Sequence, residues 1–190
     1  MALGANAMNK AFTKERDDED DDDPVEDRPR PKGTQHITPE GFRALETELK
    51  RLWNADRPKI TEEVAAAAAQ GDRSENAEYI YGKKKLREID RRIRFLRKRL
   101  DALNVVEPPK ENPDKIYFGA WFTVEDEDGA EMTYRIVGTD EIDLASRKIS
   151  VASPVAQALI GKRVGEIASI QRPKGPTEVT VMKVWYAVSG

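Results

Sequence analysis

Several residue types that mark whole classes of protein are missing or scarce in this chain of 190 residues. It has no cysteine, which excludes disulfides and thiolate metal sites. Its single histidine, His36, excludes a histidine-based metal site or catalytic triad, and we expect it in a solvated linker. No run of about eighteen apolar residues occurs, and the N-terminus lacks a secretory pattern. The sequence therefore predicts a soluble, cytoplasmic protein with no membrane partner.

Aromatic residues are also few, at 7% of the chain, whereas charged residues make up 35%. This balance favours an extended helical element beside a modest domain rather than one large core. The net charge of −3 hides an uneven distribution, with acids at residues 17–23 and bases between Lys83 and Arg99. Residues 1–36 hold little apolar surface, so we predict a disordered acidic tail. The tail could simply solvate the protein or could shield the basic run.

Two helical patterns follow the tail and predict an antiparallel hairpin over residues 37–109. The triplet Thr38–Glu40 supplies an N-cap, a proline at the first helical position and an acid at the positive end of the helix dipole. Apolar residues then recur mostly three and four apart, at Phe42, Leu45, Leu49, Leu52, Ile60, Val64 and Ala67. The phase shifts near Trp53 and Pro58, where we expect a kink or a brief loosening.

The second helical pattern begins near Ser74 and keeps a stricter seam. Its apolar residues follow a heptad repeat, at Leu86, Ile89, Ile93, Leu96, Leu100 and Leu103. Because few residues separate the two patterns, the helices must be antiparallel neighbours in a coiled coil. At 1.5 Å per residue, about 30 residues give an arm of roughly 45 Å. The alanines from Ala65 to Ala69 predict a slim end that the partner helix can approach closely.

Residues 114–190 change to a strand pattern and predict a small α+β domain, an antiparallel sheet with one short helix. The expected strands are residues 117–124, 132–137, 148–151, 166–171 and 177–186. Ser153 and Pro154 open the short helix, and Gly161 closes it. The chain is therefore expected to be α+β with two domains.

The break between the helical patterns, residues 71–79, places carboxylates at the end of the arm. Asp72 and Glu75 could form a capping box at the start of the second helix, although Ser74 could cap equally well. Two convergent carboxylates would also suit a hard divalent cation such as Mg²⁺. The pair is too small to hold the metal alone, so a partner would have to supply further ligands.

A stripe of basic residues follows the second helix at helical spacing, formed by Lys84, Arg87, Arg91, Arg94 and Lys98. Like charges at these spacings repel by a few tenths of a kcal/mol per pair, and only Glu88 and Asp90 compensate. A merely solvated face would mix its signs more, so we interpret the stripe as a contact for a polyanion. No nucleophile with an accompanying base is apparent, so a self-contained enzyme is not expected.

Two motifs resemble the Gre family of bacterial transcript-cleavage factors, which act on RNA polymerase. The first is the tip motif, residues 71–79. The second is residues 150–160 with the following Gly165-Glu166, which is similar to the family's C-terminal signature. The run from Lys83 to Arg92 resembles the GreB branch, which has a larger basic patch. The resemblance covers residues 37–187 and implies an FKBP-like C-terminal domain, whereas the acidic tail departs from the family pattern.

The resemblance also implies roles for the tip. In Gre factors the hairpin enters the secondary channel of the polymerase, and the C-terminal domain docks on the rim outside. Asp72 and Glu75 would assist the polymerase as catalytic residues and hold Mg²⁺ jointly with it. The residues that would support the loop or the substrate are Arg73, Ser74, Asn76 and Tyr79.

The same resemblance implies the partners. The basic stripe would contact the extruded 3′ end of the nascent RNA, and the surface that docks on bacterial RNA polymerase would include Ser153, Pro154 and Val155. We expect a monomer that stimulates cleavage of backtracked RNA without being an enzyme. Two alternatives stay open: a regulator that occupies the channel without supporting cleavage, and a prolyl isomerase. Retention of both tip carboxylates argues against the first, and the lack of an aromatic pocket pattern argues against the second.

Overall fold

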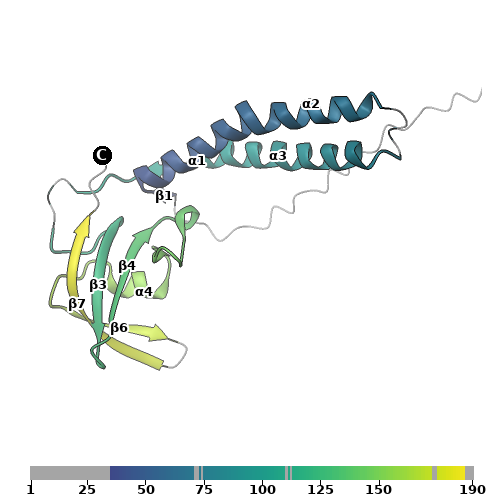
Figure 1. The fold of residues 1–190 in the computed structure, drawn as a ribbon. Coiled ribbons are helices and arrows are strands. Elements are labelled where there is room, and N and C mark those ends of the chain that lie inside the picture. The colour runs from purple at the N-terminus through teal and green to yellow at the C-terminus, as the bar shows by residue number, and fades with distance from the viewer. Residues whose placement is uncertain are drawn as a thin grey trace, which may run out of the picture. The chain divides into compact units, whose positions relative to one another are not determined.

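The computed structural model describes residues 35–190 except 71, 72, 74, 110, 112, 173, 174 and 187–190. Residues 1–34 of the expected acidic tail therefore lie outside the described residues, as do Asp72 and Ser74 of the tip, whereas His36, the last residue assigned to that tail, lies in a short strand. The chain divides into two units, Met1–Lys32 and Gly33–Gly190, and the second unit holds a helical region and a sheet (Figure 1). No helix in the described part of the chain is long and apolar enough to cross a membrane.

The helical region consists of α1 (Pro39–Arg51), a π-helix (Leu52–Asp56), α2 (Arg57–Ala68) and α3 (Ala77–Ala102). Thr38 caps α1 as expected, because its hydroxyl accepts a hydrogen bond from the Gly41 amide at 3.1 Å. Contact partners move back along α3 as the chain advances through α1 and α2: Glu48 pairs with Arg92 and Arg57 with Asp90, and the Ala67 carbonyl accepts from Asn76, just before α3. The helices therefore run antiparallel, and we refer to them together as the helical arm.

The expected phase shift in the first helical pattern is confirmed, and it takes the form of a π-helix. The Arg57 amide donates to the Leu52 carbonyl five residues earlier, which is the hydrogen bond of a π turn. Pro58 follows at once; it has no amide hydrogen to donate, and its ring would clash with the carbonyl four residues before it. The wider turn keeps both Leu52 and Ile60 buried on the seam.

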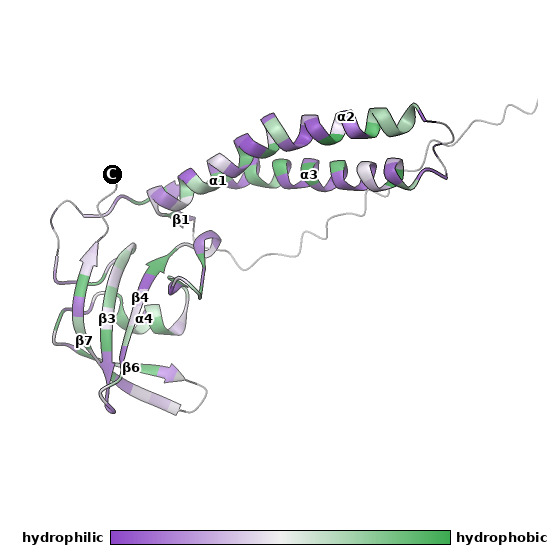
Figure 2. Cartoon of the chain, in the orientation of Figure 1, coloured by the Kyte–Doolittle hydropathy of each residue, from purple (hydrophilic) through white to green (hydrophobic). Residues whose placement is uncertain are grey.

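The seam of the arm is a narrow apolar core. Its buried residues are Leu52, Ile60, Ile89, Ile93 and Leu96, with Leu45, Leu49, Val64, Leu86 and Phe95 packed against them. Figure 2 shows hydrophobic and hydrophilic residues alternating along α2 and α3, as the heptad spacing predicts. Burial of these side chains, at about 25 cal/mol per Å² of apolar surface, is the main source of the arm's stability.

The C-terminal sheet contains β3 (Ala120–Asp126), β4 (Glu131–Val137), β5 (Lys148–Ser150), β6 (Ile167–Arg172) and β7 (Gly175–Tyr186), and the short helix is α4 (Pro154–Leu159). The strand order is β5-β4-β3-β7-β6. Ala156 and Leu159 of α4 are buried in the core of the sheet. Each expected strand and the helix are present, and Gly161, with a φ of 87°, closes the helix. The expected antiparallel pairing is confirmed for three of the four strand pairs in this sheet, but β4 and β5 are parallel, so the sheet is mixed.

A bulge in the β3–β7 pair explains a change of phase in β7. The register shifts between Thr123 and Val124, so that Met182 has no partner opposite it. Val179 and Val181 are buried before the bulge, and Val184 and Tyr186 after it. One extra residue therefore keeps both halves of the long strand facing the core.

A further pair of short strands connects the segment just before α1 with the segment just after α3, at the base of the arm. β1 (His36–Ile37) and β2 (Asn104–Val105) are parallel, and Ile37 is fully buried. His36, which we expected in a solvated linker, is exposed as expected but lies in β1 rather than in a linker. Its ring makes an edge contact with Phe118, with ring centroids 6.0 Å apart.

Candidate functional site

The end of the helical arm is organised by Asn76. Its side-chain oxygen accepts hydrogen bonds from the amides of Glu78 and Tyr79, at 3.0 and 3.1 Å, so Asn76 is the N-cap of α3. Its side-chain nitrogen donates to the carbonyl of Ala67 at 2.9 Å and so reaches the last turn of α2. One amide side chain therefore satisfies orphan backbone groups of both helices and fixes the turn between them.

This cap corrects the expected start of the second helix. α3 begins at Ala77 rather than near Ser74, so Glu75 precedes the helix and cannot be the fourth residue of a capping box. The capping-box reading of Glu75 is wrong. The sequence pattern indicated only Asp72 and Ser74 as caps and missed Asn76, although asparagine is an equally good capping residue.

Glu75 is an exposed carboxylate in the turn. Its side chain has no hydrogen-bond or ion-pair partner in the part of the chain that the structure describes. Glu78, in the first turn of α3, is also exposed, and Arg73 lies exposed in the turn as well. Carboxylate oxygens are ligands that Mg²⁺ prefers, so Glu75 fits a shared metal site in its chemistry and its accessibility. The described residues contain no cluster of three or more acids, histidines or cysteines that could hold a metal alone.

α2 and α3 pack closely together next to the turn, on the side away from the tip. Gly82 is buried, and a Cβ at this position would lie 2.6 Å from the Val64 Cγ2. Ala67, one turn nearer the tip, is buried at 4% exposure. The slim end expected from the alanine run therefore depends on a glycine in the facing helix as well. Tyr79 is half-buried near this end, and the Lys83 ammonium lies 5.4 Å from its ring centroid.

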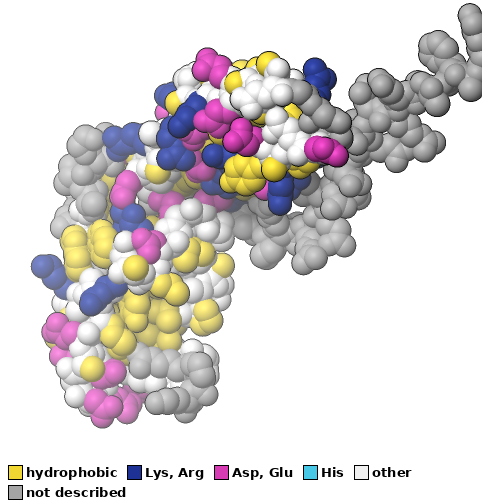
Figure 3. Space-filling model, turned by 45° about the vertical axis from the view of Figure 1, so that its right-hand side comes forward, with side chains coloured by type: hydrophobic (Ala, Val, Ile, Leu, Met, Phe, Trp, Pro, Cys, Tyr) yellow, Lys and Arg dark blue, Asp and Glu magenta, His cyan; other side chains and the backbone are white. Residues whose placement is uncertain are grey.

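Two groups among the basic residues of α3 differ in their partners. All five members of the stripe are exposed: Lys84, Arg87, Arg91, Arg94 and Lys98. None of them makes an ion pair within the described residues. Figure 3 shows basic and acidic side chains lying close together on the visible face of the molecule. Within the described residues, the stripe is nevertheless not neutralised by ion pairs.

The other group flanks the seam and is paired. Arg92 donates to both Glu48 oxygens, at 2.7 and 2.8 Å, and this contact lowers the pKa of Glu48. Arg99 makes a mostly buried ion pair with Asp140 at 2.6 Å. Within the described residues, acids therefore pair with Arg92 and Arg99 and not with the stripe. This arrangement is what a polyanion contact requires.

Three exposed apolar side chains on the arm were not indicated by the sequence patterns. Trp53, in the π-helix, is 46% exposed, and the Arg97 guanidinium lies 4.3 Å from its ring centroid. Ile80 and Tyr81, in the second turn of α3, are 54% and 67% exposed. The sequence held one signal for Ile80, because it continues the spacing of the basic stripe by four residues toward the tip.

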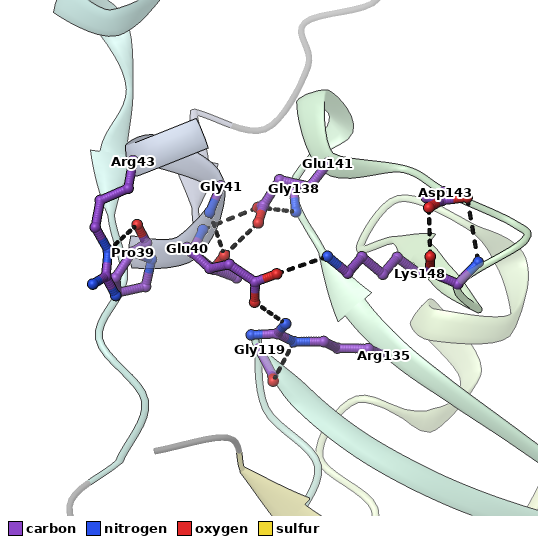
Figure 4. A network of polar contacts seen from close by, with 12 residues as sticks. Pro39, Glu40, Gly41, Arg43, Gly119, Arg135, Gly138, Glu141, Asp143 and Lys148 are labelled. Atoms are coloured by element: carbon purple, nitrogen blue, oxygen red, sulfur yellow. Dashed lines mark hydrogen bonds and ion pairs between the residues drawn. The ribbon is translucent and has the colours of Figure 1, made fainter. Parts of the chain in front are cut away.

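The base of the arm is tied to the sheet by Glu40. One of its oxygens accepts a hydrogen bond from Arg135 of β4 at 2.5 Å, and the other pairs with Lys148 of β5 at 2.9 Å (Figure 4). These contacts, with that of Arg135 the stronger, lower the pKa of Glu40 to about 2. Arg135 is itself buried and also lies 5.7 Å from the Trp121 ring centroid.

Glu141 ties the same end of the arm to the loop after β4. Its carboxylate accepts hydrogen bonds from the Thr38 amide at 3.0 Å, from the Thr38 hydroxyl and from the Gly138 amide at 3.1 Å. Thr38 is 2% exposed, so no water can replace this partner. Gly41 lies so close that a Cβ there would be 2.2 Å from Glu141 Oε1. The contacts of Glu40 and Glu141 are called the junction below.

The three residues expected to dock on a partner lie at the start of α4. Ser153 is the N-cap, and its hydroxyl accepts from the Ala156 amide at 3.2 Å. Val155 is partly buried against the sheet core, whereas Pro154 is exposed. The structure thus gives Ser153 and Val155 roles within the domain and leaves Pro154 accessible.

Comparison with known proteins adds to this geometry. Residues 35–105 match the family described as "Transcription elongation factor, N-terminal", and residues 110–186 match "Transcription elongation factor, GreA/GreB, C-term". The chain is 54% identical over 160 residues to transcription elongation factor GreB of Pseudomonas aeruginosa, covering 84% of this chain and 92% of that protein. It is 52% identical over 153 residues to GreB of Haemophilus influenzae, covering 80% and 97%.

Among solved structures, the chain is similar to GreA factor homolog 1 (Gfh1) of Thermus thermophilus at 26% identity. That match covers 78% of this chain and 97% of the other. The TM-score of the match is 0.35.

Proposed function

The chain belongs to the GreA/GreB family of transcription elongation factors, on the GreB branch, and from this premise we propose that its helical arm enters the secondary channel of RNA polymerase. The arm would act there as an antiparallel coiled coil and stimulate the polymerase to cleave backtracked RNA. The C-terminal domain, FKBP-like in this proposal, would dock on the rim outside through the surface around Ser153, Pro154 and Val155. The protein itself would not be the enzyme.

The observation that carries this proposal is that Asn76 makes the hydrogen bonds that cap α3, whereas Glu75 is exposed. Asn76 caps α3 and binds the end of α2, so the turn is held without help from the neighbouring carboxylate. Glu75 is left exposed at the end of the arm. An exposed carboxylate at the tip of the arm that has no partner among the described residues is well placed to complete a site in another protein.

Within that site, Glu75 and Asp72 would orient and hold a second Mg²⁺ together with carboxylates of the polymerase. When bound there, the metal would supply an activated water for hydrolysis of the RNA phosphodiester. Arg73, Ser74, Asn76 and Tyr79 would keep the two carboxylates in position. Asp72 lies outside the described residues, and its part in this proposal comes from the resemblance of the tip motif to the Gre family.

The stripe would bind the extruded 3′ segment of the RNA. Its five cations are exposed and lack acidic partners within the described residues. Phosphates can therefore bind them without first breaking ion pairs with those residues. Such contacts are independent of base sequence and weaken as salt rises. This suits a factor that must rescue complexes arrested at many different sequences.

A cleavage assay on halted elongation complexes with Mg²⁺ tests the proposal. We expect Glu75→Gln to reduce the rate of RNA cleavage by roughly 100-fold, the order seen when one charge-stabilising group is removed from an active site. The affinity for polymerase should change little, because Gln keeps the size and polarity of the side chain. Glu78→Gln is the matched control, since Glu78 is also exposed and lies three residues away.

The two variants should behave differently. Glu78→Gln should retain cleavage within about threefold of the unmodified chain, because it changes only a charge near the start of α3. Full cleavage by Glu75→Gln would contradict the metal-holding role. Equal losses in both variants would mean that general negative charge at the tip, rather than one carboxylate, is what the polymerase requires.

A further inference from the structure

The second turn of α3 carries an exposed apolar pair that the proposed function does not use. Ile80 and Tyr81 are 54% and 67% exposed. Neither side chain has a ring contact or a hydrogen bond among the described residues. The next residue, Gly82, is buried against Val64, so this turn packs on α2 through a different face. The described part of the chain leaves the pair uncovered.

The pair stands at a boundary between charges of opposite sign. Ile80 precedes Lys84 by four residues and Arg87 by seven, so it lies on the face of the stripe. Tyr81 precedes Lys84 by three residues and is its neighbour on the helix surface. On the tip side of the pair stand Glu75 and Glu78, both exposed. Along the arm the order is therefore acids, an apolar pair and then cations.

This order fits a single strand of nucleic acid that lies along the arm. Its phosphates would pair with the stripe, whereas the acids of the tip repel phosphate in the absence of a metal. The group facing the boundary should then be a base, whose flat apolar surface stacks on aromatic side chains in single-strand binding proteins. We infer that Tyr81, flanked by Ile80, is a stacking site for an unpaired base of the extruded RNA.

The inference rests on the proposed function, since it takes the stripe to follow extruded RNA. It adds a contact of a different chemical kind, because a stacked base contributes through its ring rather than its charge. The contact should therefore depend little on salt, unlike the contacts of the stripe. Stacking is also tolerant of base identity, because every base has a π face.

Three substitutions at one position test the nature of the contact. At a factor concentration below saturation, we expect Tyr81→Ala to slow cleavage of backtracked complexes about tenfold, the usual scale for loss of one stacked base. Tyr81→Phe keeps the ring and should cleave as the unmodified chain does. Tyr81→Leu keeps apolar surface without a π face and should resemble Tyr81→Ala. Tyr117→Ala, in the C-terminal domain, is a control for loss of an exposed tyrosine, since Tyr117 is 45% exposed.

A second arm of the experiment changes the RNA. With abasic nucleotides in the extruded segment, the unmodified chain should fall to the rate of Tyr81→Ala, and the variant should lose nothing further. Full activity of Tyr81→Leu would overturn the inference and indicate an apolar contact with polymerase. The inference would also be overturned if the unmodified chain cleaved RNA with the abasic segment as fast as ordinary RNA. If the unmodified chain stimulates no cleavage on ordinary RNA, the proposed function itself fails, which is a separate outcome.

Discussion

The tip and the base of the helical arm both carry exposed or half-exposed acids, but the two ends use them in opposite ways. At the base, Glu40 and Glu141 each accept two hydrogen bonds from groups at least 95 residues away in the sequence. At the tip, Glu75 accepts none from the described residues. The difference separates acids that hold the fold together from acids that the fold leaves accessible.

The comparison is useful because it can be made without knowing any partner. A carboxylate that satisfies a buried donor is explained by the fold, and its loss should be seen in stability. A carboxylate that satisfies nothing is not explained by the fold, and its loss should be seen in activity. The predictions below test both halves of this statement, beginning with the junction.

The largest effect is expected from Glu141→Ala. This change leaves the buried amide and hydroxyl of Thr38 and the Gly138 amide without their acceptor. Unsatisfied buried donors each cost about 1 to 3 kcal/mol, so we expect a loss of about 2 to 4 kcal/mol in the free energy of unfolding. Urea unfolding followed by tryptophan fluorescence measures it.

An exposed acid of the sheet provides the control for that measurement. Glu127 lies in the turn between β3 and β4 and is exposed, so Glu127→Ala should change stability by less than about 0.5 kcal/mol. A similar loss in both variants would mean that net charge, rather than the contacts of Glu141, determines the result.

A smaller and pH-dependent effect is expected at Glu40. Its folded pKa of about 2 lies below the ordinary value of 4.5, so its ion pairs stabilise the fold above about pH 4.5 and are lost as the pH falls toward 2. The difference in unfolding free energy between the unmodified chain and Glu40→Gln should follow the same course. We expect about 1 kcal/mol at neutral pH, because the side chain is 56% exposed and solvent screens the pair. A difference that is constant from pH 7 to pH 3 would contradict the assignment.

Local patterns predicted much of this fold. Heptad spacing identified the seam, alternation and turn residues located the strands, and Thr38 and Ser153 were found as N-caps because capping depends on a few adjacent residues. The phase shift near Trp53 was also visible, although its form as a π-helix was not. These features share one property, which is that their causes lie within about one turn or one strand of sequence.

The junction could not be predicted in this way. Glu40 and Arg135 are 95 residues apart, and Thr38 and Glu141 are 103 apart. Acids and bases are abundant throughout the chain, so no spacing rule selects these partners. The parallel pairing of β4 and β5 was missed for a related reason, since a short connection favours antiparallel neighbours. The site was predicted only in part, because spacing found the acids of the tip but could not show which of several polar residues caps α3.

The smallest effect is expected at the tip, and it sharpens the comparison most. Glu75→Gln should change the free energy of unfolding by less than about 0.5 kcal/mol, because the exposed side chain has no partner in the described structure. Asn76→Ala, one residue away, should cost about 1 kcal/mol, because it removes the cap of α3 and the bond to Ala67. The same urea titrations decide between them. If Glu75→Gln were as destabilising as Asn76→Ala, Glu75 would have a role in holding the tip, and its loss of cleavage could no longer be attributed to chemistry alone.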